Sequence, residues 1–157
     1  TDSKLEPTEG LELHLENTLA GLGADARYFS TRAGGTYYYP LAEKWVLSVL
    51  GEAGYIFGYG GEDVRINERF YIGGATLRGF EDGGIGPRDA ATRDALGGNQ
   101  FWRGSVEMAF PSGLPEDLGV RGHLFSDFGS LSDIDQTGAG ILDEDTIRVT
   151  VGAGVTW

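Results

Sequence analysis

One arginine lies in a long glycine-rich connection of this chain and is well suited to a specific contact. Leu77-Arg78-Gly79-Phe80 falls within residues 58–97, between two segments with strand-like patterns. A guanidinium group presents several N–H donors in one plane, which suits bidentate recognition of a carboxylate. Connections of this length inside a domain are usually functional or disordered. Its apolar neighbours and close glycines favour a loop held in one shape, with Arg78 directed at a partner.

An acidic stretch before the last predicted strand has the spacing of a calcium loop. Asp133, Asp135, Thr137, Gly138 and Glu144 fit positions one, three, five, six and twelve of the EF-hand pattern. The flanking segments have strand patterns, whereas an EF-hand loop needs a helix on each side. We therefore expect an acidic loop here and no metal site.

A histidine, a serine and an aspartate also occur close together, which raises the question of hydrolytic catalysis. On one strand Ser126 points away from His123 and Asp127, so these residues cannot form a triad. Glu12 and Glu16 could pair as acid and base, but a polar strand face explains them more simply. The glycine clusters lack the Gly-Lys-Ser/Thr ending of a phosphate loop. We expect no enzymatic activity and no cofactor.

The composition narrows the choice of partner and of class. A net charge of −12 and a pI near 4.4 leave no basic stripe for nucleic acid. Cysteine is absent, which rules out disulfides and thiolate metal sites. No apolar run approaches the roughly 18 residues of a membrane helix. The start at Thr1 lacks the features of a signal peptide, so we expect the chain to begin after one or inside a mature sequence.

Six segments alternate with period two, which is the pattern of strands with two different faces. In the clearest, Trp102 and Val106 point one way and Arg103, Ser105 and Glu107 the other. Helical periodicity is absent, so the sequence predicts an all-β chain. The predicted strands cover approximately residues 11–16, 26–39, 45–57, 102–110, 120–128 and 147–157.

The connections between these strands alternate in length. Residues 40–44 and 111–118 are short, whereas residues 58–97 and 131–145 form long connections at the other end. Short turns at one end and long loops at the other are typical of an outer-membrane barrel, and aromatic residues cluster near the short turns as a girdle would. The smallest bacterial barrels have about eight strands, so six indicate an incomplete barrel. A soluble β-sandwich also has alternating strands and remains the alternative.

Two motifs resemble those of the BamA family, which includes outer-membrane insertases and two-partner secretion pores. Leu77-Arg78-Gly79-Phe80 is similar to the family's loop-six motif, V/L/I-R-G-F/Y. Residues 125–129, Phe-Ser-Asp-Phe-Gly, are similar to its F/G-x-D-x-G strand motif. Residues 69–74, 94–99 and 113–119 also resemble the family, so the likeness covers essentially the whole chain.

This resemblance implies the architecture, the location and the partners. It implies a sixteen-stranded transmembrane barrel in the bacterial outer membrane, preceded by periplasmic POTRA domains. Residues 1–157 would supply roughly strands nine to fourteen, with 58–97 as an inward-folded loop six. The lateral gate between the first and last strands would then lie outside this chain. The implied partners are outer-membrane lipids, unfolded client proteins and accessory assembly lipoproteins, with no nucleic acid.

The resemblance also implies that the loop-six arginine meets acidic residues on the inner wall, and strand parity points to the same place. Glu107 and Asp127 fall on the polar faces of adjacent antiparallel strands, where both could accept hydrogen bonds from Arg78. We expect Leu77, Gly79, Phe80 and Gly129 to complete this structural lock. Its residues are then Leu77, Arg78, Gly79, Phe80, Glu107, Asp127 and Gly129.

The sequence is compatible with several functions. The leading interpretation is part of an insertase that folds and inserts β-barrel proteins without covalent chemistry. A TamA-like assembly factor or a two-partner secretion pore is the runner-up. A porin-type barrel, which would lack the lock, and a soluble β-sandwich that binds a ligand are the remaining alternatives.

Overall fold

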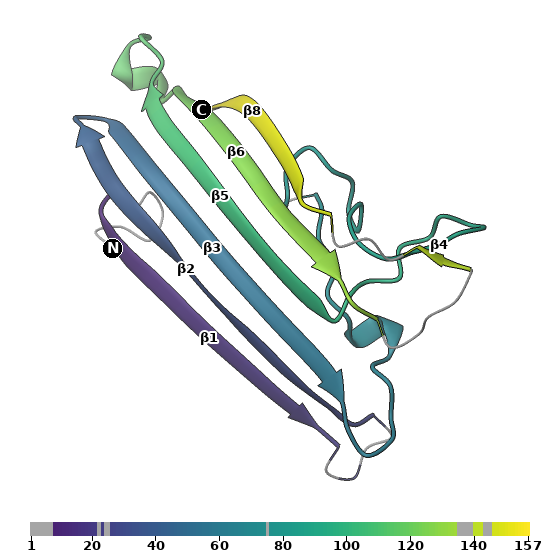
Figure 1. Ribbon diagram of the computed structural model, residues 1–157. Helices are drawn as coiled ribbons and strands as arrows, with labels where there is room; N and C mark the ends of the chain where they lie inside the picture. Colours follow the sequence, from purple (N-terminus) through teal and green to yellow (C-terminus); the bar gives the residue numbers. More distant parts are fainter. Residues whose placement is uncertain (1–7, 22, 24–25, 75, 135–139, 143–145) are drawn as a thin grey trace.

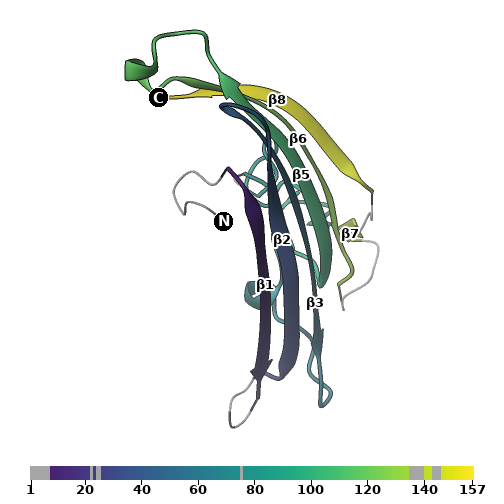
Figure 2. The same cartoon turned by 90° about the vertical axis from the view of Figure 1, so that its left-hand side faces the viewer.

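The computed structural model describes residues 8–21, 23, 26–74, 76–134, 140–142 and 146–157. Its main element is one antiparallel sheet in the order β1-β2-β3-β5-β6-β8, in which each long strand pairs with its neighbours along the chain (Figure 1). The strands are β1 (Gly10–Ala20), β2 (Tyr28–Ala42), β3 (Trp45–Gly58), β5 (Gln100–Pro111), β6 (Arg121–Ser132) and β8 (Arg148–Thr156). All six predicted segments are strands, and the all-β prediction is confirmed. Seen from the side, the sheet is a curved wall with β1 and β8 at its edges (Figure 2).

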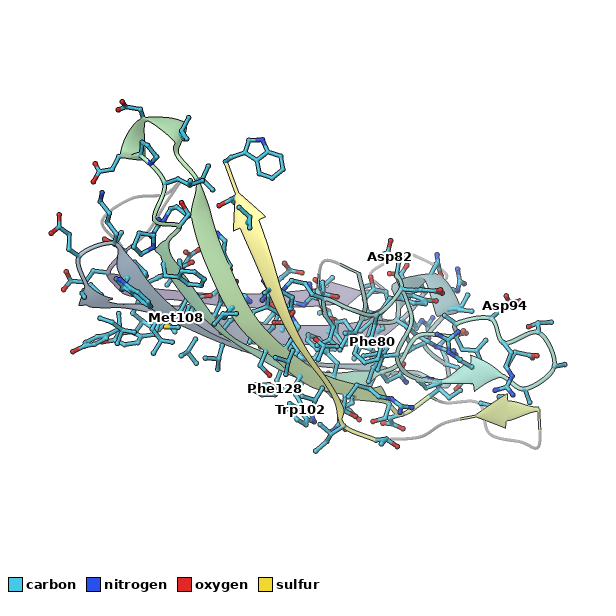
Figure 3. The ribbon with its side chains drawn as sticks, turned by 90° about the horizontal axis from the view of Figure 1, so that it is seen from above. Phe80, Asp82, Asp94, Trp102, Met108 and Phe128 are labelled. Atoms are coloured by element: carbon cyan, nitrogen blue, oxygen red, sulfur yellow. The ribbon has the colours of Figure 1, made fainter. Side chains whose placement is uncertain are left out.

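The register of the sheet gathers apolar side chains on one face. Val49 on β3 lies opposite Tyr37 on β2 and Val106 on β5, and Val106 belongs to the predicted apolar face. The large exposed residues of this face include Leu11, Leu13, Leu15, Tyr37, Val49, Val106, Leu124, Val149, Val151 and Val155. Trp102, Met108 and Phe128 point to this side, away from Phe80 of the long connection (Figure 3). An apolar face this large is expected to meet lipid or protein rather than water.

The short connections differ slightly from those predicted. Strand β2 runs on to Ala42, so the turn before β3 is only Glu43 and Lys44, and Lys44 takes a left-handed conformation with φ of 65°. The pairing shifts between Pro40 and Ala42, because proline cannot donate to the ladder and is placed at such irregularities. The second short connection contains the 3-10 turn η2 (Glu116–Leu118).

The buried apolar core lies between the long connection and the polar face of the wall. Phe101 of β5 and Leu131 of β6 supply the wall side, while Ile72, Leu77 and Ile85 come from the connection. The partly buried rings of Phe70 and Phe80 pack against this cluster. The chain therefore buries this apolar cluster by folding the connection between β3 and β5 onto the sheet.

The two long connections also pair with each other. Strand β4 (Arg88–Asp89) in the first forms a two-residue antiparallel ladder with β7 (Ile141–Leu142) in the second. The 3-10 turn η1 (Ile66–Glu68) lies near the start of the first connection. No helix in the described ranges is long and apolar enough to cross a membrane.

Candidate functional site

Three neighbouring strands form the floor of the site. Ser105 of β5, Asp127 of β6 and Thr150 of β8 lie directly opposite one another in the sheet. Two residues further along the strands, Glu107 of β5 lies opposite Phe125 of β6. Since side chains two apart on a strand share a face, all five point to the polar side.

Arg78 reaches this floor from the long connection. Its Nε and Nη2 donate to Oδ2 and Oδ1 of Asp127, each at 2.7 Å, which is the bidentate geometry of a guanidinium–carboxylate pair. Nη1 donates to Oε2 of Glu107 at 2.9 Å, and Nη2 also donates to the hydroxyl of Ser105 at 3.1 Å. The structure thus brings together Arg78, Asp127 and Glu107, the three residues for which strand parity predicted a contact.

The backbone of Arg78 is held as firmly as its side chain. Its N–H donates to Oδ2 of Asp127 at 3.0 Å, and its carbonyl accepts from the hydroxyl of Thr150 at 2.7 Å. The guanidinium also lies over the ring of Phe125, with 3.7 Å between its central carbon and the ring centroid. Ser105 in turn donates to Asp127 at 2.5 Å, which fixes the carboxylate.

Burial differs across the site and sets the cost of breaking it. The Asp127 side chain is only 4% exposed, whereas those of Arg78 and Glu107 are 32% and 28% exposed. The Asp127 carboxylate hydrogen-bonded to Arg78 raises the pKa of the guanidinium above its usual value, while burial opposes this effect. Arg78 therefore carries its charge at every accessible pH. Four of the five guanidinium N–H donors have partners, which leaves little capacity to bind an anion.

The neighbours of Arg78 in the motif anchor the loop sterically. Leu77 is fully buried in the core cluster, and Phe80 packs against the same cluster. Gly79 has φ of 91°, and a Cβ there would come within 2.8 Å of Cγ2 of Thr150. Only glycine satisfies both the left-handed backbone and this close approach.

Two further predicted residues lie at the edges of the site. Nδ1 of His123 is 3.0 Å from Oε1 of Glu107, and its Nε2 is 2.9 Å from the hydroxyl of Thr156. His123 thus faces the polar side, as expected. Gly129 lies directly opposite Arg103, whose Cβ would be 3.1 Å from a Cβ at that position.

The remaining candidates are not brought together in the described part of the chain. Ser126 pairs with Val106 and Val151 on the apolar face, away from Asp127. Asp135, Thr137, Gly138 and Glu144 of the calcium-like stretch lie outside the described residues. Within the described residues, no group of three histidine or acidic side chains could hold a metal ion.

Sequence reasoning missed three members of the site: Ser105, Phe125 and Thr150. Strand parity places Ser105 on the correct polar face, but it does not give the level at which a loop residue meets a strand. Phe125 belongs to the 125–129 motif, but the motif does not indicate the contact of its ring with the guanidinium of Arg78.

Comparison with known proteins shows the family of the chain. Residues 1–157 match the Omp85 superfamily domain. The chain is 37% identical over 158 residues to an outer membrane protein assembly factor BamA from Neorickettsia risticii (strain Illinois), covering 99% of the chain and 21% of the relative. It is 34% identical over 139 residues to the BamA of Neisseria meningitidis serogroup B, covering 85% of the chain and 17% of that protein. It thus spans about a fifth of the length of these relatives.

More distant relatives and a solved structure extend the comparison. The mouse sorting and assembly machinery component 50 homolog is 31% identical over 126 residues, covering 79% of the chain and 26% of the relative. The crystal structure of BamA from Haemophilus ducreyi lacking POTRA domains 1–3 superposes with a TM-score of 0.86 at 24% identity, covering 99% of the chain and 34% of that protein. The chain therefore belongs to the Omp85 superfamily, and its open sheet is a segment of a BamA-type outer-membrane β-barrel.

Proposed function

We propose that this chain is part of an assembly factor that folds and inserts β-barrel proteins into the bacterial outer membrane. The support is family membership over the whole chain, together with the names of the BamA relatives, which are outer membrane protein assembly factors. Since the chain covers about a fifth of these relatives, the activity belongs to the longer protein and this segment contributes to it.

The observation that carries the proposed role of this segment is the engagement of Arg78 with Asp127, Glu107, Ser105 and Thr150. Through these contacts residues 58–97 act as a structural lock, folded against the inner wall as a distinct part of the barrel domain. Removing one partner of a buried ion pair costs about 3–5 kcal/mol, and Asp127 is nearly buried. The lock keeps the wall and the loop in one shape, which is the contribution of this segment to assembly.

In this proposal the protein is not an enzyme and needs no cofactor. Insertion proceeds by non-covalent steps, in which the exposed apolar face meets outer-membrane lipids and the complete barrel receives unfolded client proteins. Accessory assembly lipoproteins act with the full-length protein. The contacts of Arg78 serve to position the loop, since four of its five guanidinium N–H donors are already used within the chain.

Charge reversal in the full-length protein tests the lock. We expect Arg78→Glu and Asp127→Arg each to lower the insertion of a reporter barrel into vesicles, because each places two like charges in contact. The double variant restores opposite charges and should recover part of the activity. Arg65→Glu is the control, because Arg65 is exposed on the same connection.

The outcome is clear in either direction. Normal insertion and normal barrel folding in both single variants would show that the lock has no role in assembly. If insertion is also lost in the Arg65→Glu control, the result would show only that the connection does not tolerate an additional acidic side chain.

A further inference from the structure

A second charged row crosses the inner wall beside the Arg78 site. It lies two residues along each strand from the row that holds Ser105, Asp127 and Thr150. The row has one residue from each of the six long strands, directly opposite one another: His14, Gly34, Glu52, Arg103, Gly129 and Arg148.

Arg103 joins this row to the long connection. Its Nε donates to Oε1 of Glu52 at 2.9 Å, while its Nη1 donates to the backbone carbonyl of Thr76 at 3.0 Å. Thr76 precedes Arg78 by two residues. The side chains of Arg103 and Glu52 are only 19% and 10% exposed, so this pair is more shielded than an ordinary surface pair.

Glu52 is also held from the opposite side. Nε2 of His14 lies 2.8 Å from Oε2 of Glu52, although a whole strand separates them. Gly34 on that strand makes the contact feasible, because a Cβ there would lie 2.8 Å from Cε1 of His14 and 2.6 Å from the carbonyl of Gly51. One oxygen of Glu52 thus faces His14 and the other receives Arg103, which fixes the direction of the guanidinium.

The segment before Arg78 is stabilised by hydrogen bonds between Gly73 and Thr76. The Thr76 hydroxyl donates to the carbonyl of Gly73 at 2.8 Å and lies 3.0 Å from the N–H of Gly73, which donates to it. Arg103 therefore donates its hydrogen bond to a turn that is itself held by hydrogen bonds between Gly73 and Thr76. Between this turn and Arg78 lies only Leu77, which is fully buried.

We propose that Arg103 is a positioning residue for the lock: held by Glu52 and His14, it fixes the carbonyl of Thr76 so that Arg78 enters in line with Asp127. An ordinary cross-strand ion pair would stabilise the sheet alone, whereas this pair gives one donor to the loop. The proposal rests on the function proposed above for Arg78 and adds a second attachment point upstream of the motif.

A charge swap in the full-length protein separates positioning from simple pairing. Glu52→Arg with Arg103→Glu keeps an ion pair across the same two strands but moves the donor from β5 to β3, away from Thr76. Hydrogen exchange of peptides that cover residues 74–80 reports on the loop. Exchange of β5 and β6, together with thermal unfolding of the barrel, reports on the wall.

The single variant Arg103→Met should raise exchange over residues 74–80 by about tenfold or more, which corresponds to losing one hydrogen bond from a charged donor. The swap should restore the unfolding temperature without restoring protection of the loop. If the swap restores both, Arg103 only stabilises the sheet and the proposal is wrong. Unchanged loop exchange in Arg103→Met would also overturn it.

A double-mutant cycle on insertion adds a functional measurement. If Arg103 acts through Arg78, Arg103→Met should slow insertion in the native background and have no further effect in Arg78→Met. Additive losses would contradict the proposal. Should Arg103→Met fail to fold, Arg103→Lys keeps the charge without the planar fork and should still raise loop exchange.

These readouts also separate the two proposals. A loop freed by Arg103→Met alongside normal insertion in the Arg78 variants would refute the proposed function and leave the positioning role intact. Impaired insertion in the Arg78 variants with an unchanged loop in Arg103→Met would give the opposite result.

Discussion

Arg78 depends on the shape of its side chain as much as on its charge. Its planar group meets both oxygens of Asp127, one of Glu107 and the hydroxyl of Ser105. A lysine carries the same charge on one nitrogen with three donors and cannot reproduce this fork.

We expect Arg78→Lys to lower the free energy of unfolding by about 2 kcal/mol, within the range for hydrogen bonds to charged groups. Urea unfolding of the full-length protein in vesicles would measure it, with Arg65→Lys as the control on the same connection. Equal stability of the two variants would mean that charge alone holds the loop.

Gly79 offers a test of steric fit at the same site. We expect Gly79→Ala to cost more than Gly113→Ala, because both glycines have a positive φ but only Gly79 faces a neighbour within 4 Å. The backbone strain alone is about 1–3 kcal/mol in either position. Unfolding midpoints of the two variants would give the difference.

A second substitution identifies the cause of this difference. Thr150→Ser removes the Cγ2 that a Cβ at residue 79 would meet, yet keeps the hydroxyl that donates to the carbonyl of Arg78. It should recover the extra loss in Gly79→Ala. Failure to recover any stability would exclude the contact with Thr150 as the cause.

At the scale of elements, alternation in the sequence predicted the six strands and their faces because each strand has one polar and one apolar side. The resemblance implied that Arg78 meets acidic residues of the wall, and the same parity placed Glu107 and Asp127 on the polar face. The link from Arg103 to Glu52 and Thr76 did not, because parity gives the face of a side chain but not its level. That level depends on the register, which the short turns and the shift near Pro40 determine.

The pairing of β4 with β7 could not be predicted from the sequence either. Two residues are too few to show a period of two, and the partners Arg88 and Leu142 come from different connections. Tertiary contacts determine whether such short strands pair, so no local sequence pattern predicts them.

The turn after β4 should weaken in acid. One oxygen of Asp89 accepts from the N–H groups of Thr92 and Ala91, and these bonds lower the pKa of its carboxyl group. A carboxyl group whose pKa is lowered by folding stabilises the fold at pH values above its pKa in the unfolded chain, which is about 3.9. The stabilisation is lost as the pH falls through the pKa of the group in the folded protein. Protection factors of residues 89–93 should therefore be constant near neutral pH and fall below pH of about 4.

The variant Asp89→Asn provides the comparison for this acid effect. Its amide oxygen still accepts hydrogen bonds but does not titrate, so protection in the turn should be lower at neutral pH and independent of pH. The same acid-induced loss in both proteins would mean that another group is responsible.

Considered as a whole, the molecule has its apolar surface outside and its polar contacts inside. The exposed residues of the outer face include Leu15 at 69% and Val151 at 82%, while Asp127 and Arg69 are buried on the inner side. Such an inverted distribution is stable when lipid, rather than water, covers the outer face.

We expect the cost of an arginine on the outer face to depend on its depth. Leu15→Arg, in the middle of β1, should destabilise the barrel in vesicles by about 2–4 kcal/mol, and Leu11→Arg, near its short-turn end, by about 0–1 kcal/mol. Unfolding of the full-length variants in vesicles would measure both. Equal costs at the two positions would contradict a membrane-spanning orientation of β1.

The positions of the site residues along the chain bear on the order in which the contacts of Arg78 form during folding. Arg78 precedes Glu107 by 29 residues, Asp127 by 49 and Thr150 by 72, so every partner emerges after it. The complete set of contacts needs residues from β5, β6 and β8, and closing these long intervals is slow compared with forming a hairpin. An Arg78 that makes all these contacts therefore marks a wall in which β5, β6 and β8 are in place, and we expect these contacts to be among the last to form during folding.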